Sequence, residues 1–235
     1  MTGGSARVAH EHADVTGGWL RPAVFGAMDG LVSNFALIAG VAGGGVDRTV
    51  IVLAGLAGLA AGAFSMAAGE YTSVAAQAEL AEAEIAVERE ELRTNAAAEE
   101  RELAAMYVDR GLDPDLAAEV ARQLHRDPET ALNVHAREEL GVTPGELPSP
   151  RLAATSSFLS FAVGALIPVL PYLLGLDALW LVTVLSLAGL FVCGAVVTQV
   201  TSRPWWYGGI RQLVLGSAAA ALTYAFGNLV GAGLG

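Results

Sequence analysis

One acidic segment of the chain holds residues whose types and spacing suit a metal ion. Three groups in it are spaced by three or four positions, which places the members of each group on one face of a helix. These groups are Glu84, Glu88 and Glu91, then Glu99 and Glu102, then His135 and Glu139. If the helices that carry them pack together, the carboxylates and the imidazole converge. Such a set needs a cation, because unpaired carboxylates repel one another and their pKa values rise.

The alternative interpretation of this segment is a solvated acidic surface. It is the better interpretation for four further glutamates, Glu79, Glu82, Glu90 and Glu100. His135 has its own alternative, as a surface histidine next to Arg137 and Glu138. Both interpretations stay open on the sequence alone.

A second group of polar residues lies in otherwise apolar stretches. Asp29 interrupts the first apolar run and is followed closely by Ser33 and Asn34. A carboxylate inside a membrane is costly unless it is hydrated, paired or bound to an ion. In the second apolar run Met66 and Glu70 share a helix face, and a thioether beside a carboxylate suits Fe²⁺ better than Ca²⁺ or Mg²⁺. The alternatives are a protonated or interfacial carboxyl at Asp29 and ordinary core packing at Met66.

Five apolar runs predict an all-α integral membrane protein with five transmembrane helices. Each run is long enough to cross a bilayer core of about 30 Å as a helix. The runs cover roughly residues 23–45, 49–68, 153–175, 178–200 and 209–232. Pro168 and Pro171 predict a kink in the third span. Three glycine pairs have the spacing that favours close helix packing, Gly26/Gly30, Gly58/Gly62 and Gly227/Gly231.

The hydrophilic insert between the second and third spans is expected to be helical. The stretch 73–93 contains no Gly or Pro, so the second span should continue into the insert as one long helix. Shorter helices are expected over 96–110, 114–125 and 128–140, the last two starting at Asp-Pro pairs. The expected divisions are an N-terminal tail over 1–21, two spans over 22–78, a metal-binding insert over 79–150 and three spans over 151–235.

Charge is concentrated in the insert and sets the expected orientation. The segment from Glu79 to Glu146 carries 18 of the 24 acidic residues and seven of the 13 basic ones, so it accounts for the net charge of −11. Its natural partners are cations, and nucleic acid is excluded as a partner. The arginines near the spans lie on the side of the N-terminus and the insert, with Arg48 alone on the other side. The positive-inside rule then places the N-terminus and the insert in the cytoplasm and the C-terminus outside.

Composition narrows the setting further. Every basic residue is Arg, and the chain is rich in Ala, Gly, Val and Leu, which suggests a GC-rich bacterial genome and hence a bacterial inner membrane. Cys193 is the single cysteine, so a disulfide framework is excluded. The first 20 residues, with His10 and His12, lack the features of a signal peptide.

Two ungapped stretches resemble the vacuolar iron transporter family. They are Phe25-Gly26-x-x-Asp29-Gly30-Leu31-Val32-Ser33-Asn34 and Ser65-Met66-Ala67-Ala68-Gly69-Glu70-Tyr71-Thr72-Ser73. The resemblance covers nearly the whole chain, from about Trp19 to Gly235. It implies a homodimer in a lipid bilayer that exports Fe²⁺, and also Mn²⁺ and similar ions, from the cytoplasm in exchange for protons. It implies neither a prosthetic group nor an enzymatic reaction.

The resemblance also implies roles for particular residues. The intramembrane Asp and Met of the family fall on Asp29 and Met66, in an ion path between the first helices of two subunits. Its four metal-binding insert glutamates fall on Glu88, Glu91, Glu99 and Glu102. A later Met and Glu of the insert site fall on His135 and Glu139. Histidine in place of Met keeps a metal donor but hardens it, which puts the metal preference in question.

The sequence therefore predicts a divalent-metal transporter whose insert gathers Fe²⁺, or Mn²⁺, Co²⁺ or Zn²⁺, for Asp29 and Met66. A proton on Asp29 or Glu70 would compete with the metal and couple the two fluxes. One alternative is a membrane-anchored ferroxidase or iron store, although the Glu-x-x-His pairs of ferritin-like sites are absent from the insert. The other alternative is a metal sensor that does not transport.

Overall fold

The computed structural model describes residues 18–198 and 203–234, and this part of the chain contains helices and short connections but no strand. The predicted tail up to residue 17, with His10 and His12, lies outside the described residues. The elements in chain order are α1 (Leu20–Gly43), α2 (Arg48–Thr94), α3 (Ala96–Asp109), α4 (Pro114–Leu124), α5 (Pro128–His135), the π-helix η1 (Ala136–Leu140), α6 (Pro150–Leu173), α7 (Leu179–Val197) and α8 (Trp205–Leu234). The all-α expectation is confirmed.

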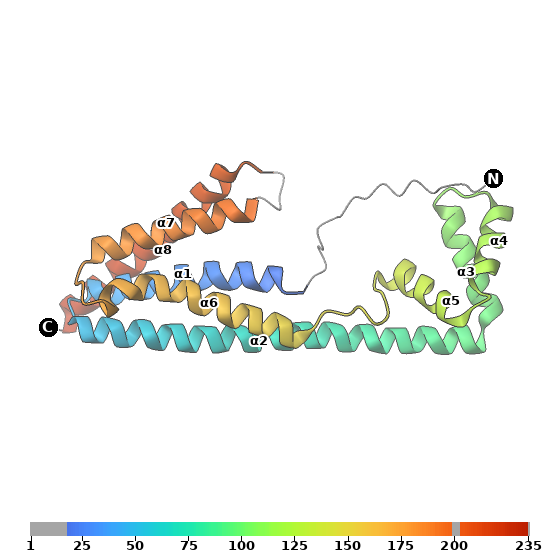
Figure 1. Cartoon of the computed structure of the whole chain (residues 1–235), viewed down its shortest axis with the longest axis horizontal. Coiled ribbons are helices and arrows are strands. Elements are labelled where there is room, and N and C mark those ends of the chain that lie inside the picture. The colour runs from blue at the N-terminus through green and yellow to red at the C-terminus, as the bar shows by residue number, and fades with distance from the viewer. Residues whose placement is uncertain (1–17, 199–202, 235) are drawn as a thin grey trace, which may run out of the picture.

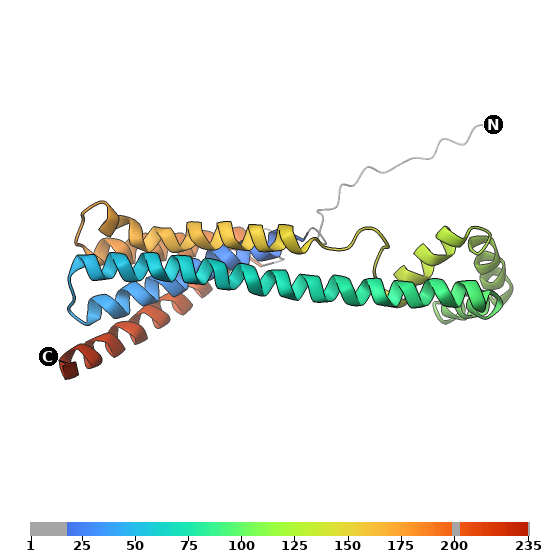
Figure 2. The same cartoon turned by 90° about the horizontal axis from the view of Figure 1, so that it is seen from below.

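Helix α2 runs along almost the whole molecule (Figures 1 and 2). Its 47 residues extend over about 70 Å at the helical rise of 1.5 Å per residue. Its first half is apolar and lies among the other apolar helices, and its second half carries the acidic insert. The prediction of one continuous helix from the second apolar run into the insert is confirmed.

Five helices of the described chain, α1, α2, α6, α7 and α8, are long and apolar enough to cross a membrane. Their ends differ from the predicted ones by a few residues. Helix α6 already begins at Pro150, where Ser149 caps the first turn, and α8 begins at Trp205, directly after Pro204. Helix α6 continues through Pro168 and Pro171, so these prolines do not end it, and a kink there stays a prediction.

Glycines allow these apolar helices to approach one another closely. A Cβ atom added at Gly26 or Gly30 of α1 would meet backbone atoms of α6. One added at Gly227 of α8 would meet backbone atoms of α1, and one added at Gly231 would meet those of Gly44, directly after α1. Gly58 and Gly62 of α2 face side chains of α1 and α6. All three predicted glycine pairs therefore lie at helix contacts.

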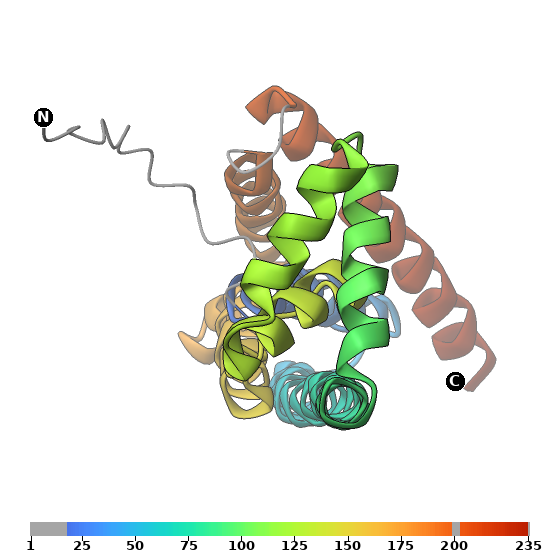
Figure 3. The ribbon, with the colours of Figure 1, turned by 90° about the vertical axis from the view of Figure 1, so that its right-hand side faces the viewer.

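The acidic insert folds back over the far end of α2, and Figure 3 shows α3 and α4 side by side there. A small apolar core of Ile85, Leu132 and Ala136 packs α5 and η1 against α2. Asp113 and Asp127 accept hydrogen bonds from backbone N–H groups in the first turns of α4 and α5. The two predicted Asp-Pro helix starts are therefore confirmed.

The last insert helix differs from the continuous α-helix predicted over 128–140. The chain is α-helical to His135 and then forms a π-helix over Ala136–Leu140, which ends at Gly141. Gly141 has a φ of 68°, a left-handed conformation that favours glycine. The wider π-helical turn still leaves His135 and Glu139 in contact, at 2.7 Å between Nδ1 and Oε1.

Candidate metal centre

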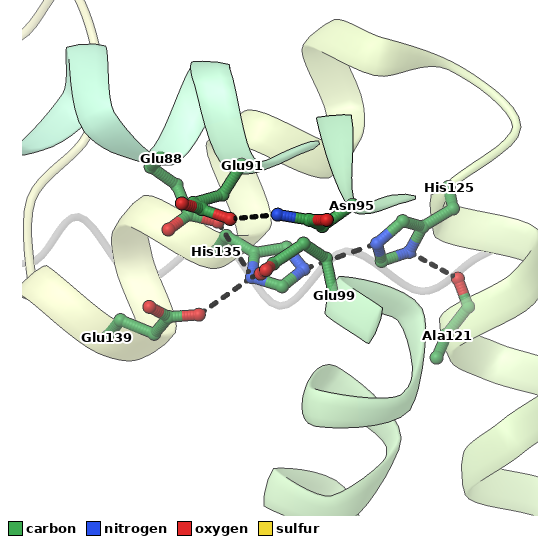
Figure 4. Close-up of polar contacts among 8 residues, drawn as sticks. All are labelled: Glu88, Glu91, Asn95, Glu99, Ala121, His125, His135 and Glu139. Atoms are coloured by element: carbon green, nitrogen blue, oxygen red, sulfur yellow. Dashed lines mark hydrogen bonds and ion pairs between the residues drawn. The ribbon is translucent and has the colours of Figure 1, made fainter. Parts of the chain in front are cut away.

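His135 lies at the centre of three carboxylates (Figure 4). Its side chain is fully buried, and its Nδ1 lies 2.7 Å from Glu139 Oε1, 3.1 Å from Glu88 Oε1 and 3.9 Å from Glu99 Oε2. Each of the four residues offers one ligand atom, and these atoms lie within 4.8 Å of one another. We call Glu88, Glu99, His135 and Glu139 the insert cluster. Small side-chain adjustments would bring these four atoms to the distance of about 2.0–2.2 Å at which nitrogen and oxygen ligands bind one metal ion.

Four separate elements supply the insert cluster. Glu88 comes from α2, Glu99 from the first turn of α3, His135 from the end of α5 and Glu139 from η1. The chain turns at Asn95 between α2 and α3, which brings Glu99 back towards α2. The small apolar core of the insert holds α5 and η1 against α2. Packing of this core therefore decides whether the cluster forms.

Electrostatics in the insert cluster disfavour three ionised carboxylates. Burial, and after it the charge of Glu139, raises the pKa of Glu88 to about 7 against the opposing effect of His135. Burial also raises the pKa of Glu99, as does the charge of Glu102. A divalent cation would offset this repulsion, since an opposite charge within a few ångströms favours the ionised form.

Glu88 gives a second indication that the insert cluster suits a cation. Its Oε1 is buried and makes no hydrogen bond, although His135 Nδ1 lies 3.1 Å away. A buried polar atom without a partner is costly. Three carboxylates and an imidazole form a donor set that suits Zn²⁺, Fe²⁺, Mn²⁺ and Co²⁺.

The other predicted ligands of the insert lie around this cluster. Glu91 is half-buried, and its carboxylate accepts a hydrogen bond from the Asn95 side chain at 2.6 Å (Figure 4). Glu102 is exposed, but its charge acts on both Glu88 and Glu99. Glu84 is exposed and is not among the four converging residues. The structure thus brings together four of the seven predicted insert ligands.

His125 is a neighbour of the site that the sequence analysis missed. Its Nε2 lies 3.3 Å from His135 Nε2, and its Nδ1 lies 2.9 Å from the carbonyl oxygen of Ala121. The two imidazole rings meet edge to face, with centroids 5.2 Å apart. Its only signal in the sequence was a histidine ten residues before His135, across the Asp127-Pro128 helix start.

The polar residues of the apolar helices gather at a second place. Asp29, Ser33, Asn34 and Met66 line a cavity of about 360 Å³ between α1, α2 and α6, together with Ser65. Ser33 donates a hydrogen bond of 2.7 Å to Asp29. We call this space the α1–α2 cavity. It combines a carboxylate, hydroxyl groups and a thioether.

Asn34 fixes the wall of the α1–α2 cavity. Its buried side-chain amide donates to the backbone carbonyls of Gly55 in α2 and Ala165 in α6, at 3.1 and 2.6 Å. Its Oδ1 has no hydrogen-bond partner. The residue therefore connects three helices and leaves one oxygen free for a ligand or water.

Glu70 and the insert cluster lie farther along α2. Glu70 is half-buried and is not among the described residues that line the α1–α2 cavity. It follows Met66 by one helical turn, about 6 Å along the axis. Glu88 follows Met66 by about 33 Å at the helical rise of 1.5 Å per residue. The two candidate metal sites are therefore distinct and share one helix.

The chain is similar to known proteins over residues that include both candidate sites. A profile of the VIT family matches residues 20–228. A vacuolar iron transporter of Acanthamoeba castellanii is 39% identical over 228 residues, which are 94% of this chain and 82% of the relative. Vacuolar iron transporter 1 of Oryza sativa is 30% identical over 94% of this chain and 90% of its own length. Vacuolar iron transporter 1 of Arabidopsis thaliana is 30% identical over 90% of this chain and 86% of its own length.

These relatives do not come from bacteria, so a bacterial origin and a bacterial inner membrane stay predictions that the comparisons do not support. The family match and the five long apolar helices agree on an integral membrane protein. The match begins at the first residue of α1 and ends inside α8, so it includes the α1–α2 cavity and the insert cluster alike. The chain therefore belongs to the VIT family.

Proposed function

We propose that the protein transports a divalent transition metal, with Fe²⁺ as the first candidate, across a membrane. The observation that carries the proposal is the α1–α2 cavity, which Asp29 and Met66 both line between helices that are otherwise apolar. A hard carboxylate and a soft thioether at one site favour Fe²⁺ and its neighbours over Ca²⁺ or Mg²⁺. The relatives named as vacuolar iron transporters support the same metal. Mn²⁺, Co²⁺ and Zn²⁺ are the further candidates.

The proposed topology has five membrane crossings. The N-terminus and the insert lie in the cytoplasm, and the C-terminus lies on the opposite side, because arginines near the spans concentrate on the first side. Metal then moves out of the cytoplasm. A proton and a divalent cation compete for a carboxylate at Asp29 or Glu70, which makes proton antiport the proposed coupling.

A second copy of the chain completes the proposed path. Asp29 and Ser33 are exposed on the single chain, although they lie within a helix that is apolar enough to cross a membrane. An exposed carboxylate in that setting would face lipid at considerable cost. A homodimer that joins the α1 helices would cover Asp29 and place two carboxylates on one path.

The insert cluster is proposed to collect metal in the cytoplasm before it reaches the cavity. Its repelling carboxylates and buried His135 bind a cation more readily than a solvated acidic surface would. The distance along α2 means that the metal must leave the cluster before it enters the cavity. Binding in the insert and transport are therefore separable functions.

Flux measurements on the reconstituted protein test the proposal. Proteoliposomes are supplied with Fe²⁺, Mn²⁺, Co²⁺ or Zn²⁺, with and without a pH gradient. We expect flux of Fe²⁺ that rises with the gradient and is lost in Asp29→Asn, which keeps the side-chain shape but removes the charge. Absence of flux in the wild type would favour the sensor, and oxygen consumption on addition of Fe²⁺ would favour the ferroxidase.

A further inference from the structure

We infer that His125 is the positioning residue of the insert cluster, which fixes His135 in the tautomer that binds metal through Nδ1. The inference rests on the proposed metal binding by the cluster. It assigns a role to a residue outside the four converging ligands.

The first step is the contact between His125 and the backbone. His125 Nδ1 lies 2.9 Å from the carbonyl oxygen of Ala121 in the preceding turn of α4. A carbonyl oxygen only accepts, so Nδ1 of His125 must carry the hydrogen atom. In a neutral imidazole the other nitrogen, Nε2, then holds a lone pair.

The second step is the contact between the two rings. His125 Nε2 lies 3.3 Å from His135 Nε2, and the rings are nearly perpendicular, with an angle of 88° between their planes. Because His125 Nε2 then offers a lone pair, the contact between the rings is a hydrogen bond only when His135 donates from Nε2. The lone pair of a neutral His135 is therefore on Nδ1, the nitrogen that faces Glu88 and Glu139 (Figure 4).

The third step concerns the competing tautomer. If the hydrogen atom of His135 were on Nδ1, it would be donated to Glu139, 2.7 Å away, and this nitrogen could not bind a metal. The fully buried ring would also need another donor for Nε2. His125 favours the metal-binding tautomer because it offers an acceptor to Nε2. Histidines that bind metals commonly donate their second ring nitrogen in this way, and loss of the partner costs about 10–100-fold in affinity.

The test uses the full-length protein in detergent with Co²⁺ as the probe, since its visible spectrum reports ligand geometry. His125→Phe keeps a flat ring but offers no acceptor, and we expect its Co²⁺ affinity to fall about 10–100-fold with a changed spectrum. His125→Gln offers a side-chain oxygen as acceptor and should recover most of that loss. In a His135→Ala background, His125→Phe should have no further effect, because the two residues act through one contact. Gln123→Ala, an exposed change on the same helix, is the matched control.

A second measurement needs no variant at position 125. The chain has only four histidines, so ¹⁵N chemical shifts of labelled imidazoles in the Zn²⁺-loaded protein are assignable. We expect His135 bound to Zn²⁺ through Nδ1 with hydrogen on Nε2, and His125 with hydrogen on Nδ1. Coordination of His135 through Nε2, or wild-type affinity and spectrum in His125→Phe, would overturn the inference. If the wild type binds neither Co²⁺ nor Zn²⁺ in the insert, the proposed metal site fails and the inference fails with it.

Discussion

Glu88 shows how burial of a ligand makes metal binding depend on pH. Its pKa is raised to about 7 by burial and by the nearby charge of Glu139, against the opposing effect of His135. Below pH 7 the carboxyl must release a proton before it binds metal. The Co²⁺ affinity of the insert should therefore fall by up to about tenfold for each pH unit below 7. Competition titrations between pH 8 and pH 6 measure this slope, and an equal slope in Glu88→Gln would contradict the assignment to Glu88.

The same carboxyl should destabilise the metal-free protein at neutral pH. Its folded-state pKa lies above the ordinary value of 4.5. The folded state therefore holds more protons between about pH 4.5 and 7, and stability falls as the pH rises through this range. In EDTA at pH 8, Glu88→Gln should raise the free energy of unfolding by on the order of 1–3 kcal/mol.

Thermal unfolding in EDTA at pH 8 and at pH 5 checks this expectation. At pH 5 the difference between Glu88→Gln and the wild type should shrink, since the carboxyl is then mostly neutral in the folded protein. Glu84→Gln, an exposed position one turn earlier on α2, is the matched control and should have no effect. A lower free energy of unfolding for Glu88→Gln at pH 8 would show that the ionised Glu88 carboxylate does not destabilise the folded protein.

At the scale of the helices, the contact of α1 with α6 depends on the absence of side chains. A Cβ atom at Gly30 would meet the backbone carbonyl of Phe161, which cannot rotate away. Gly30→Ala should therefore cost about 1–3 kcal/mol through overpacking. Gly69 of α2 has nothing within 4 Å of an added Cβ atom in the single chain. Gly69→Ala should instead gain up to about 1 kcal/mol from helix propensity.

Unfolding of the two variants in detergent, followed by tryptophan fluorescence, compares them directly. Equal stability of Gly30→Ala and the wild type would mean that α1 and α6 can separate without cost. A loss in Gly69→Ala that disappears on dilution to monomers would instead place Gly69 at a contact between copies.

The same helices show what could be predicted from sequence. Hydropathy runs and a stretch free of Gly and Pro predict the apolar helices and the length of α2, because both signals are local. The spacing of Glu88 within its group, and of His135 with Glu139, predicts candidate ligands. It does not predict that these residues from different helices converge on one site. That convergence depends on the turn at Asn95 and on the core around Ile85.

Other features had no local signal. The contact of His125 with His135 depends on the angle between α4 and α5, which the Asp127-Pro128 start does not specify. The π-helical turn over Ala136–Leu140 contacts α2, and the spacing pattern of these residues does not distinguish it from an α-helix. Glu84 has the spacing of a ligand, yet it is exposed and is not among the four residues that converge.

At the scale of the whole molecule, the two candidate sites should respond independently to mutation. Asp29 and the insert cluster lie in different parts of the chain, and Met66 and Glu88 are about 33 Å apart along α2. Asp29→Asn should therefore abolish flux while the Co²⁺ affinity of the insert changes less than about twofold. Flux assays and Co²⁺ titrations on the same preparations measure both quantities.

The reciprocal variant replaces Glu88, Glu99 and Glu139 together by Gln. It should raise the metal concentration that gives half-maximal flux but leave a flux that still depends on Asp29. Loss of all flux in a well-folded triple variant would show that metal must pass through the insert. Unchanged concentration dependence would show that the insert does not deliver metal.

The length of α2 also decides which metal concentration the insert cluster experiences. Anionic lipids attract cations to a membrane surface, and this enrichment decays within about 8 Å at physiological salt. Glu88 lies about 27 Å along α2 from Glu70, the first charge after the apolar run of that helix. In the proposed topology, with Glu70 near the membrane surface, the cluster would lie about three screening lengths from that surface, measured along the helix. In that topology the cluster would respond to the free metal of the bulk solution and not to the layer enriched at the lipid surface.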